Sequence, residues 1–342
     1  MNTNAPSSFL PNLPHFSRSA TFGMLIAVCL LLLFIDISVG AVRLSLSEVF
    51  RALIAGEGDE STVAIVRDIR TVKAVVAVLV GFSLSVSGLQ MQTLFRNPLA
   101  GPYVLGISSG ASIGVALFLL GGGMAMMPPA FYSLGIAGAA WVGSIAILLM
   151  IALLSRRIKD IMVILILGMM FSSGASAIVQ ILQYSSNEES LKSFVIWTMG
   201  SLGEVTSMQL FIFIPAVVLG LLLAVVTIKP LNMLLFGEDY ARTMGLDINR
   251  SRWILFASTT LLAGTSTAFC GPIGFIGLAI PHVARLLISD SNHRVLMPAT
   301  LLCGGIAMLL CDIISKAWGF PINAVTALLG IPVVVWVVMK NR

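Results

Sequence analysis

The sequence predicts an all-α polytopic membrane protein with about ten transmembrane helices. Of its 342 residues, 58% are hydrophobic and only 10% are charged, and the mean hydropathy is +1.01. A soluble protein cannot carry that much apolar surface, so the bilayer must be the solvent. A span needs roughly 20 apolar residues, and the chain was divided at its charged and Pro/Gly-rich breaks. The resulting spans are 20–42, 74–95, 102–122, 132–154, 161–183, 209–228, 253–270, 273–288, 296–315 and 322–339.

The polar residues 1–19 are expected to form a cytoplasmic tail, and residues 20–342 a single transmembrane domain. No small-residue cleavage site follows the first span, which favours a retained anchor over a signal peptide. With ten spans and a cytoplasmic N-terminus, 13 of the 20 Lys and Arg residues fall in inner loops and 7 in outer loops. We therefore expect both termini in the cytoplasm, and we attribute the net charge of +5 to topology and not to nucleic acid.

Residues typical of metal binding or catalysis are scattered. The four cysteines lie in apolar spans without a Cys-x-x-Cys pair, and the three histidines are far apart. The sequence contains no Gly-x-x-x-x-Gly-Lys-Ser/Thr phosphate-binding loop. Asp36 and Asp312 lie toward the outer ends of their spans, whereas a proton-driven carrier usually needs an ionisable relay nearer the midplane. The sequence thus predicts no enzyme, no metal site and no cofactor bound by this chain, but a conduit driven from outside.

Two spans carry small or polar residues at helical spacing. In the third span, Gly106, Gly110 and Gly114 recur every four residues, which predicts close approach of a neighbouring helix. The fifth span is unusually polar for lipid contact, so it serves either tight packing or a water-filled path. Its polar residues include Ser172, Ser173, Ser176 and Gln180.

Two sequence breaks precede or interrupt the eighth span. Gly271-Pro272-Ile273-Gly274 falls between spans seven and eight, and Pro281-His282 lies inside span eight. Proline removes a helical hydrogen bond, which membranes tolerate where protein or water satisfies the freed groups. Transporters often place such breaks at sites or hinges, and a packing kink is the alternative for each break taken alone.

One charged segment, Lys229 to Arg252, separates two apolar halves of the chain. Counting spans places this segment in the cytoplasm. Within it, Glu238, Ala241 and Gly245 have the acidic-small-glycine spacing of a short helix followed by a tight turn. From its residues alone, the segment is explained equally well as a positive-inside loop or as the contact with an external motor.

A resemblance to a known family begins at two adjacent motifs. They read Arg96-Asn97-Pro98-Leu99-Ala100-Gly101-Pro102 and Leu105-Gly106-Ile107-Ser108-Ser109-Gly110-Ala111. Both resemble the FecCD-type permeases, the membrane subunits of bacterial ABC importers for iron chelates, haem and cobalamin. Further similar motifs follow in the family's order: Gly274-Phe275-Ile276-Gly277-Leu278, Pro281-His282, Arg285, Asp290-Ser291-Asn292-His293-Arg294, Asp312, and Pro321 through Gly330-x-Pro332. The resemblance runs from about Arg70 to the C-terminus.

The resemblance implies a ten-helix subunit with the type II ABC importer permease fold in the bacterial inner membrane. Such a subunit dimerises around a central path, and a homodimer is expected. Two cytoplasmic ATPases, which hold ATP and Mg, would bind below, and a periplasmic or lipid-anchored substrate-binding protein would dock above. The cargo would be a ferric siderophore, with cobalamin or haem as alternatives that no residue here distinguishes. The rival function is a stand-alone secondary carrier.

The resemblance also implies roles for particular residues. The ATPase-coupling residues of loop 229–252 would be Glu238, Ala241, Gly245 and Leu246. The translocation path would be lined by Met169, Ser172, Ser173, Ser176 and Gln180 of the fifth helix and by Val325, Leu328 and Leu329 of the tenth. The cytoplasmic gate would lie at Asn97 and Leu99.

Basic residues at the outer surface would receive acidic side chains of the binding protein. They are Arg70, Lys73 and Lys316. Here Arg70-Thr71-Val72-Lys73 replaces the family's usual Arg-x-Pro-Arg, and lysine attracts a carboxylate without gripping it bidentately. Snorkelling side chains at the membrane edge are the alternative. Gly319 and Asn323 also depart from the family pattern at the outer mouth.

Overall fold

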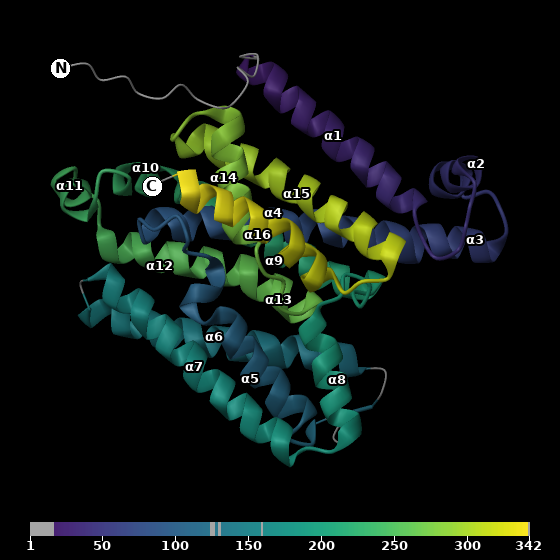
Figure 1. Ribbon diagram of the computed structural model, residues 1–342, viewed down its shortest axis with the longest axis horizontal. Coiled ribbons are helices and arrows are strands. Elements are labelled where there is room, and N and C mark those ends of the chain that lie inside the picture. Colours follow the sequence, from purple (N-terminus) through teal and green to yellow (C-terminus); the bar gives the residue numbers. More distant parts are fainter. Residues whose placement is uncertain (1–16, 124–126, 129–130, 159, 341–342) are drawn as a thin grey trace.

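The computed structural model describes residues 17–123, 127–128, 131–158 and 160–340, which form a bundle of helices with no strand among them (Figure 1). Seven helical segments of this described part are long and apolar enough to cross a membrane. They are α1 (Arg18–Ser38), Glu60–Leu94 with α4 (Val72–Leu94), α6 (Tyr132–Arg157), α7 (Ile161–Ser185), α9 (Ser207–Val226), Ile248–Cys270 with α12 (Ile248–Thr259) and α13 (Thr265–Cys270), and α15 (His293–Trp318).

Three more apolar helices complete the predicted set: α5 (Ile107–Leu119), α14 (Ile276–Ile288) and α16 (Ile322–Lys340). The prediction of about ten membrane-spanning helices is therefore confirmed, and each predicted span contains a helix. α5 and α14 have 13 residues each, about 20 Å of helix, whereas the hydrocarbon core is about 30 Å thick. Both are preceded by non-α-helical segments that complete their spans. The predicted N-terminal tail falls mostly on residues 1–16, which lie outside the described residues.

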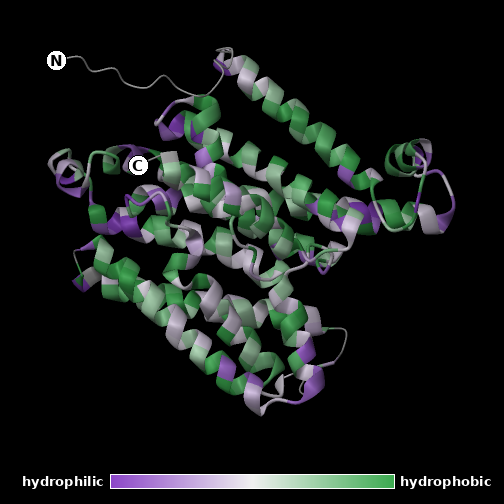
Figure 2. Ribbon diagram, viewed as in Figure 1, coloured by the Kyte–Doolittle hydropathy of each residue, from purple (hydrophilic) through white to green (hydrophobic). Residues whose placement is uncertain are grey.

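Short elements lie at the two ends of the bundle, where Figure 2 shows polar residues flanking an apolar middle. One end, here called the α2 end, carries α2 (Leu46–Phe50), η1 (Arg51–Ala55), α3 (Glu60–Ala64), η2 (Ile65–Thr71) and α8 (Glu188–Met199). The other, the α11 end, carries α10 (Ile228–Leu234) and α11 (Glu238–Thr243). In α2, the backbone N–H of Ser45 donates to the Glu48 carboxylate (2.7 Å) and holds the pKa of Glu48 below its ordinary value.

The start of α1 and the end of α16 lie at the α11 end. Arg18 pairs with Asp290 in the α14–α15 connection (3.2 Å), and Asn232 of α10 bonds to Asn292 in the same connection (2.9 Å). α16 begins just after α15 ends at the opposite side, so its C-terminal end returns to the α11 end (Figure 1).

α4 is the central helix of the bundle, and most of its side chains are buried. It packs against α14 and α15 through glycines, because a Cβ added at Gly88 would overlap the carbonyl oxygen of Gly277, and one added at Gly81 would overlap that of Gly304. Such close backbone approach is how helices associate in lipid, where apolar burial gives no advantage.

The small-residue face predicted for the third span is confirmed in α5. A Cβ added at Gly110 would meet the Gly143 backbone of α6, and one added at Gly114 would overlap the Ala139 carbonyl. Gly106 instead precedes α5 with a φ of +73°, a left-handed conformation that glycine adopts without strain.

The break at Gly271–Gly274 is confirmed, since α13 ends at Cys270, Gly271 has a φ of +75°, and α14 begins at Ile276. The predicted interruption at Pro281 is wrong: α14 continues through this residue to Ile288. Proline removes the helical partner of the Gly277 carbonyl. That carbonyl faces Gly88 of α4, where no side chain stands, so α14 and α4 approach closely at this point.

Candidate functional site

The polar residues of α7 occupy an open face of the chain. Met169 is 48% exposed, and Ser173, Ser176 and Gln180 are exposed, while Ser172 is partly buried. The serine hydroxyls donate to carbonyls one turn back, as Ser176 does to Ser172 (2.9 Å). These internal bonds satisfy the hydroxyl donors and leave a mixed hydroxyl and apolar surface.

A hollow of about 280 Å³ lies between α5, α7 and α8. Its polar lining residues are Ser108, Ser109, Ser112, Ser176, Gln180, Gln183 and Thr198. The other face of α7 packs tightly, because a Cβ at Gly168 would overlap the carbonyl of Val104. Tight packing is therefore observed on one face of α7, and the water-filled path predicted for its polar residues stays a prediction.

The residues predicted on α16 fall into two environments. Leu328 and Leu329 are 68% and 45% exposed, whereas Val325 is 2% exposed and lies inside the subunit. α16 packs mainly against α14 and α15, while α7 packs against α5 and α6. The two halves of the predicted path thus lie on different parts of this chain and are not brought together within it.

The predicted gate lies in the turn after α4. The Asn97 side chain accepts a hydrogen bond from the Leu99 backbone N–H (2.9 Å), and Leu99 is 42% exposed. His282 of α14 donates from Nε2 to the Pro98 carbonyl (2.8 Å). The turn is consequently held by its own asparagine from one side and by α14 from the other.

Around this turn lies a group here called the hydrogen-bond cluster, formed by Gln92, Thr93, Asn232, His282, Arg285 and His293. Arg285 donates to the Gln92 carboxamide oxygen (2.7 Å), and Gln92 donates to the Leu278 carbonyl (3.0 Å). Together these contacts bind the C-terminal turn of α4 to α14.

The same cluster reaches α10 through His293. Its backbone N–H and its Nδ1 both lie 2.8 Å from the Asn232 carboxamide oxygen. Its Nε2 lies 2.9 Å from the Thr93 hydroxyl of α4. A continuous polar chain therefore runs from α10, which precedes α11, to the end of α4, which carries the gate turn.

The four predicted coupling residues lie together in α11 and the turn after it. Ala241 is fully buried, and Gly245 has a φ of +84°, with the Leu246 N–H closing onto the Ala241 carbonyl (3.0 Å). Glu238 pairs with Arg252 of α12 (2.6 Å), whose side chain is 2% exposed. A buried guanidinium thus ties this short helix to a membrane-spanning one, a contact that the sequence analysis did not predict.

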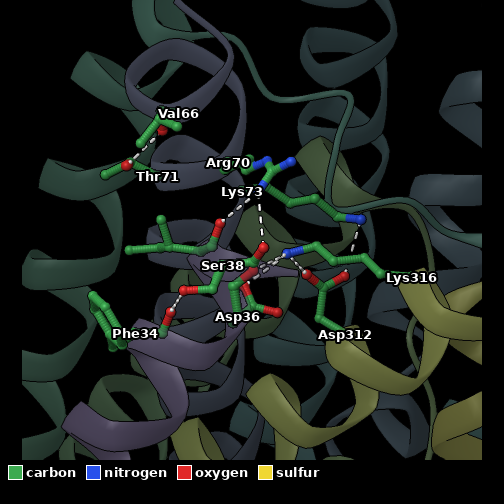
Figure 3. A network of polar contacts seen from close by, with 10 residues as sticks. Phe34, Asp36, Ser38, Val66, Arg70, Thr71, Lys73, Asp312 and Lys316 are labelled. Atoms are coloured by element: carbon green, nitrogen blue, oxygen red, sulfur yellow. Dashed lines mark hydrogen bonds and ion pairs between the residues drawn. The ribbon is translucent and has the colours of Figure 1, made fainter. Parts of the chain in front are cut away.

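At the α2 end, Figure 3 shows a second group, here called the ion-pair cluster: Asp36, Lys73, Asp312 and Lys316. The Lys316 ammonium lies 2.8 Å from a carboxylate oxygen of Asp36 and 2.8 Å from one of Asp312. Lys73 lies 3.1 Å from the other Asp312 oxygen. Because the two carboxylates are 0% and 1% exposed, the cluster joins α1, α4 and α15 through desolvated charges.

Arg70, shown beside this cluster in Figure 3, is 4% exposed and caps the C-terminal end of α1. Its guanidinium donates to the carbonyls of Ile37 (3.2 Å), Ser38 (2.9 Å) and Val42. Basic groups stabilise helix C-termini in this way. The docking role predicted for Arg70, Lys73 and Lys316 stays a prediction, and of the three only Lys73 has a substantially accessible side chain, at 23%.

Sequence reasoning missed the residues that join the elements. Gln92, Asn232, Asp36 and Arg252 each make a contact across many positions of the chain. For Gln92 and Asp36 a signal existed, because polar and ionisable residues inside apolar spans are costly and mark sites. Their partners could not be found without the fold.

Comparisons with known proteins agree with this architecture. Residues 28–340 match the FecCD transport family. The chain is 34% identical over 324 residues to the Hemin transport system permease protein HmuU of Yersinia pestis. The aligned region covers 92% of this chain and 95% of that protein. It is 38% identical over 279 residues to the Vitamin B12 import system permease protein BtuC of Escherichia coli O9:H4 (strain HS), covering 80% and 83% respectively. A solved structure described as an inward-facing conformation of a metal-chelate type ABC transporter superposes with a TM-score of 0.81 at 28% identity, over 95% of this chain and 100% of that one.

Proposed function

The chain belongs to the FecCD transport family, and from this premise we propose that it is the permease subunit of a binding-protein-dependent ABC importer for a metal chelate. The observation that carries the proposal is the similarity, over nearly the whole chain, to permeases for hemin and for vitamin B12. Both of those cargoes are large organic ligands around a metal ion. A ferric siderophore, haem or cobalamin is therefore the cargo class.

The proposed orientation places the α11 end in the cytoplasm, together with both ends of the chain. The path would form where the open faces of α7 and α16 meet those of a second copy, which makes the homodimer the functional unit. Hydroxyl and aliphatic side chains on these faces would bind cargo weakly, and weak binding suits passage because tight binding would trap the chelate.

Energy would enter at α11, where Glu238 through Leu246 would contact a separate ATPase. The buried pair with Arg252 supports this role, because it makes α11 move with α12. The chain from Asn232 through His293 to Thr93 then connects α10 to the end of α4, next to the gate turn. A rigid-body movement of the α11 end would then be transmitted to the gate turn through these side-chain contacts.

Docking of the binding protein at the α2 end would begin at Lys73. Charge reversal of Arg70 or Lys316 is a poor test, because both side chains are buried against α1 and their loss would disturb the fold. Lys73→Ala should weaken stimulation of ATP hydrolysis by the binding protein, while Lys192→Ala, an exposed lysine in α8 at the same end, should leave it unchanged. Because Lys73 also pairs with the buried Asp312, the thermal unfolding of Lys73→Ala is measured alongside to separate docking from stability. Equal stimulation in both variants would contradict docking at Lys73.

The decisive experiment is reconstitution in vesicles with the cognate ATPase and binding protein. Uptake of labelled cobalamin, haem and ferric siderophore is measured in parallel, with and without ATP. ATP-dependent uptake of one of the three is expected. Uptake driven by an ion gradient without ATP would overturn the proposal and identify a secondary carrier.

A further inference from the structure

An apolar crevice of about 300 Å³ lies between α1, α14, α15 and α16. Its walls include Leu25 of α1, Ile276 and Leu287 of α14, Ala307 of α15 and Val333 of α16. The lining side chains are apolar or thiol-bearing except for a threonine of α16 whose hydroxyl donates within its own helix (3.0 Å). The walls of the crevice can therefore pack against an apolar chain, which needs no polar group to fit there.

The length of the crevice matches one leaflet of a bilayer. Its α14 wall runs from Ile276 to Leu287, which at 1.5 Å per residue is about 16 Å. Half of the hydrocarbon core is about 15 Å thick. A molecule that fills the crevice from the membrane surface therefore extends to about the midplane of the bilayer. One acyl chain of a phospholipid extends to the same depth.

The surface end of the crevice is basic. Leu287 lies three residues before Asp290, which pairs with Arg18 at the start of α1 (3.2 Å). The Arg18 side chain is 70% exposed, and Arg294 is exposed in the first turn of α15. Arg294 follows Asp290 by four residues, so two arginines and one carboxylate belong to this end of the crevice, and guanidinium binds phosphate oxygens with bidentate geometry.

We propose that this crevice is a binding site for an anionic phospholipid, with one acyl chain between α1 and α16 and the phosphate at Arg18 and Arg294. Lipid tails are as apolar as leucine, so burial alone does not favour the site over the bulk bilayer. Selectivity comes from the headgroup, because the crevice ends at a net positive surface. The site does not rest on the transport function proposed above.

A second copy of the chain is the competing occupant. The crevice lies between helices of one subunit; Leu328 of α16 lies outside it, whereas Leu329, 45% exposed and also predicted to line the path, is one of its lining residues. α1 is tied to the bundle at both ends, by Arg18 to Asp290 and by Asp36 to Lys316. A gap beside a helix that is held by a buried ion pair at one end and by an exposed one at the other fits a flexible acyl chain better than a protein surface.

Native mass spectrometry of the full-length chain in detergent tests the headgroup. The probes are phosphatidylglycerol and phosphatidylcholine with identical acyl chains. The chain should retain one phosphatidylglycerol with a preference of about fivefold over phosphatidylcholine, since one net basic group near a headgroup contributes about that factor. The double variant Arg18→Gln, Arg294→Gln should lose the preference, whereas Arg250→Gln, an exposed arginine at the same end, should keep it.

The acyl site is tested by filling the crevice from two sides, with Ala307→Leu on α15 and with Val283→Phe on α14. Each variant should lose the retained lipid whatever its headgroup, while Ala146→Leu, on the exposed face of α6, should retain it. Equal lipid retention in the filled and control variants would overturn the proposal. So would a shifted monomer–dimer ratio with unchanged lipid, which would assign the crevice to a second copy. If neither filled variant folds, an unchanged headgroup preference in the double arginine variant still refutes the site.

Discussion

The two ends of the bundle hold their polar groups in different ways. At the α2 end, the ion-pair cluster joins three helices through two buried carboxylates that share the ammonium of Lys316. At the α11 end, the hydrogen-bond cluster joins four helices mainly through carboxamide, hydroxyl, imidazole and carbonyl groups. Loss of Lys316 leaves uncompensated carboxylates at the first end, whereas loss of Asn232 or His282 leaves only unmade hydrogen bonds at the second. The α11 end also holds one buried ion pair, Glu238 with Arg252, so the contrast concerns the two clusters and not every polar contact of the two ends.

The largest effect is expected from Lys316→Met. This change leaves two carboxylates, which are 0% and 1% exposed, without their shared cation. Removal of one partner from a buried ion pair costs about 3–5 kcal/mol. Thermal unfolding of the purified chain in detergent measures the loss, and Lys192→Met, on an exposed lysine at the same end, serves as the control.

Neutralising the acids should reverse most of that loss. In the triple variant Lys316→Met, Asp36→Asn, Asp312→Asn, no carboxylate of the cluster remains to be desolvated. Stability should return toward that of the unchanged chain, because the penalty arises from the unpaired charges. A triple variant less stable than Lys316→Met would show that the pairing itself, and not desolvation, dominates this end.

A smaller effect is expected from His282→Ala at the α11 end. The variant removes the donor to the Pro98 carbonyl, at a cost of about 1–3 kcal/mol. Amide hydrogen exchange around Asn97 to Ala100 should accelerate while the rest of the bundle stays protected. His282→Gln, which retains a hydrogen-bond donor, is the matched variant. Identical exchange rates in the unchanged chain and in both variants would show that the contact with α14 does not stabilise the turn.

Gly245→Ala should cost about 1–2 kcal/mol, because the φ of +84° is unfavourable for a side chain although nothing lies within 4 Å of an added Cβ. Gly23→Ala is the control, because Gly23 lies in α1 with an ordinary helical φ and equally open surroundings. This substitution should stabilise α1 slightly. With the ATPase present, Gly245→Ala should lower the uptake per ATP hydrolysed, and bulkier residues should lower it further. Unchanged coupling for every substitution at this position would refute the role of the turn.

The smallest effect is expected from Arg18→Gln. Its ion pair with Asp290 is formed by a side chain that is 70% exposed, and such pairs contribute about 0–1 kcal/mol. The loss should shrink as salt is added, since exposed charges are screened. Lys316→Met should show almost no such salt dependence, which makes the contrast between exposed and buried pairs measurable on one protein.

Several features of the fold were predictable because they depend on neighbouring residues. Runs of apolar residues predicted every span, and the glycine spacing predicted that a neighbouring helix approaches the third span closely; the structure shows that this neighbour is α6. The short helix before Gly245 followed from local spacing in the same way. The continuity of α14 through Pro281 was not predictable from the sequence break, and α9, α15 and α16 also continue through a proline.

The sequence by itself determined that the chain is a membrane protein of about ten apolar helices, and where along the chain its charged segment falls. Only the tertiary structure decided which polar groups meet. Lys316 pairs with Asp36 across 280 positions, and Arg285 reaches Gln92 across 193. Hydropathy is a sum over adjacent residues, whereas the partner of a buried charge is chosen by the packing of helices that are far apart in the chain. The same packing decided that Arg70 donates to the carbonyls at the end of α1, a contact that adjacent residues do not reveal.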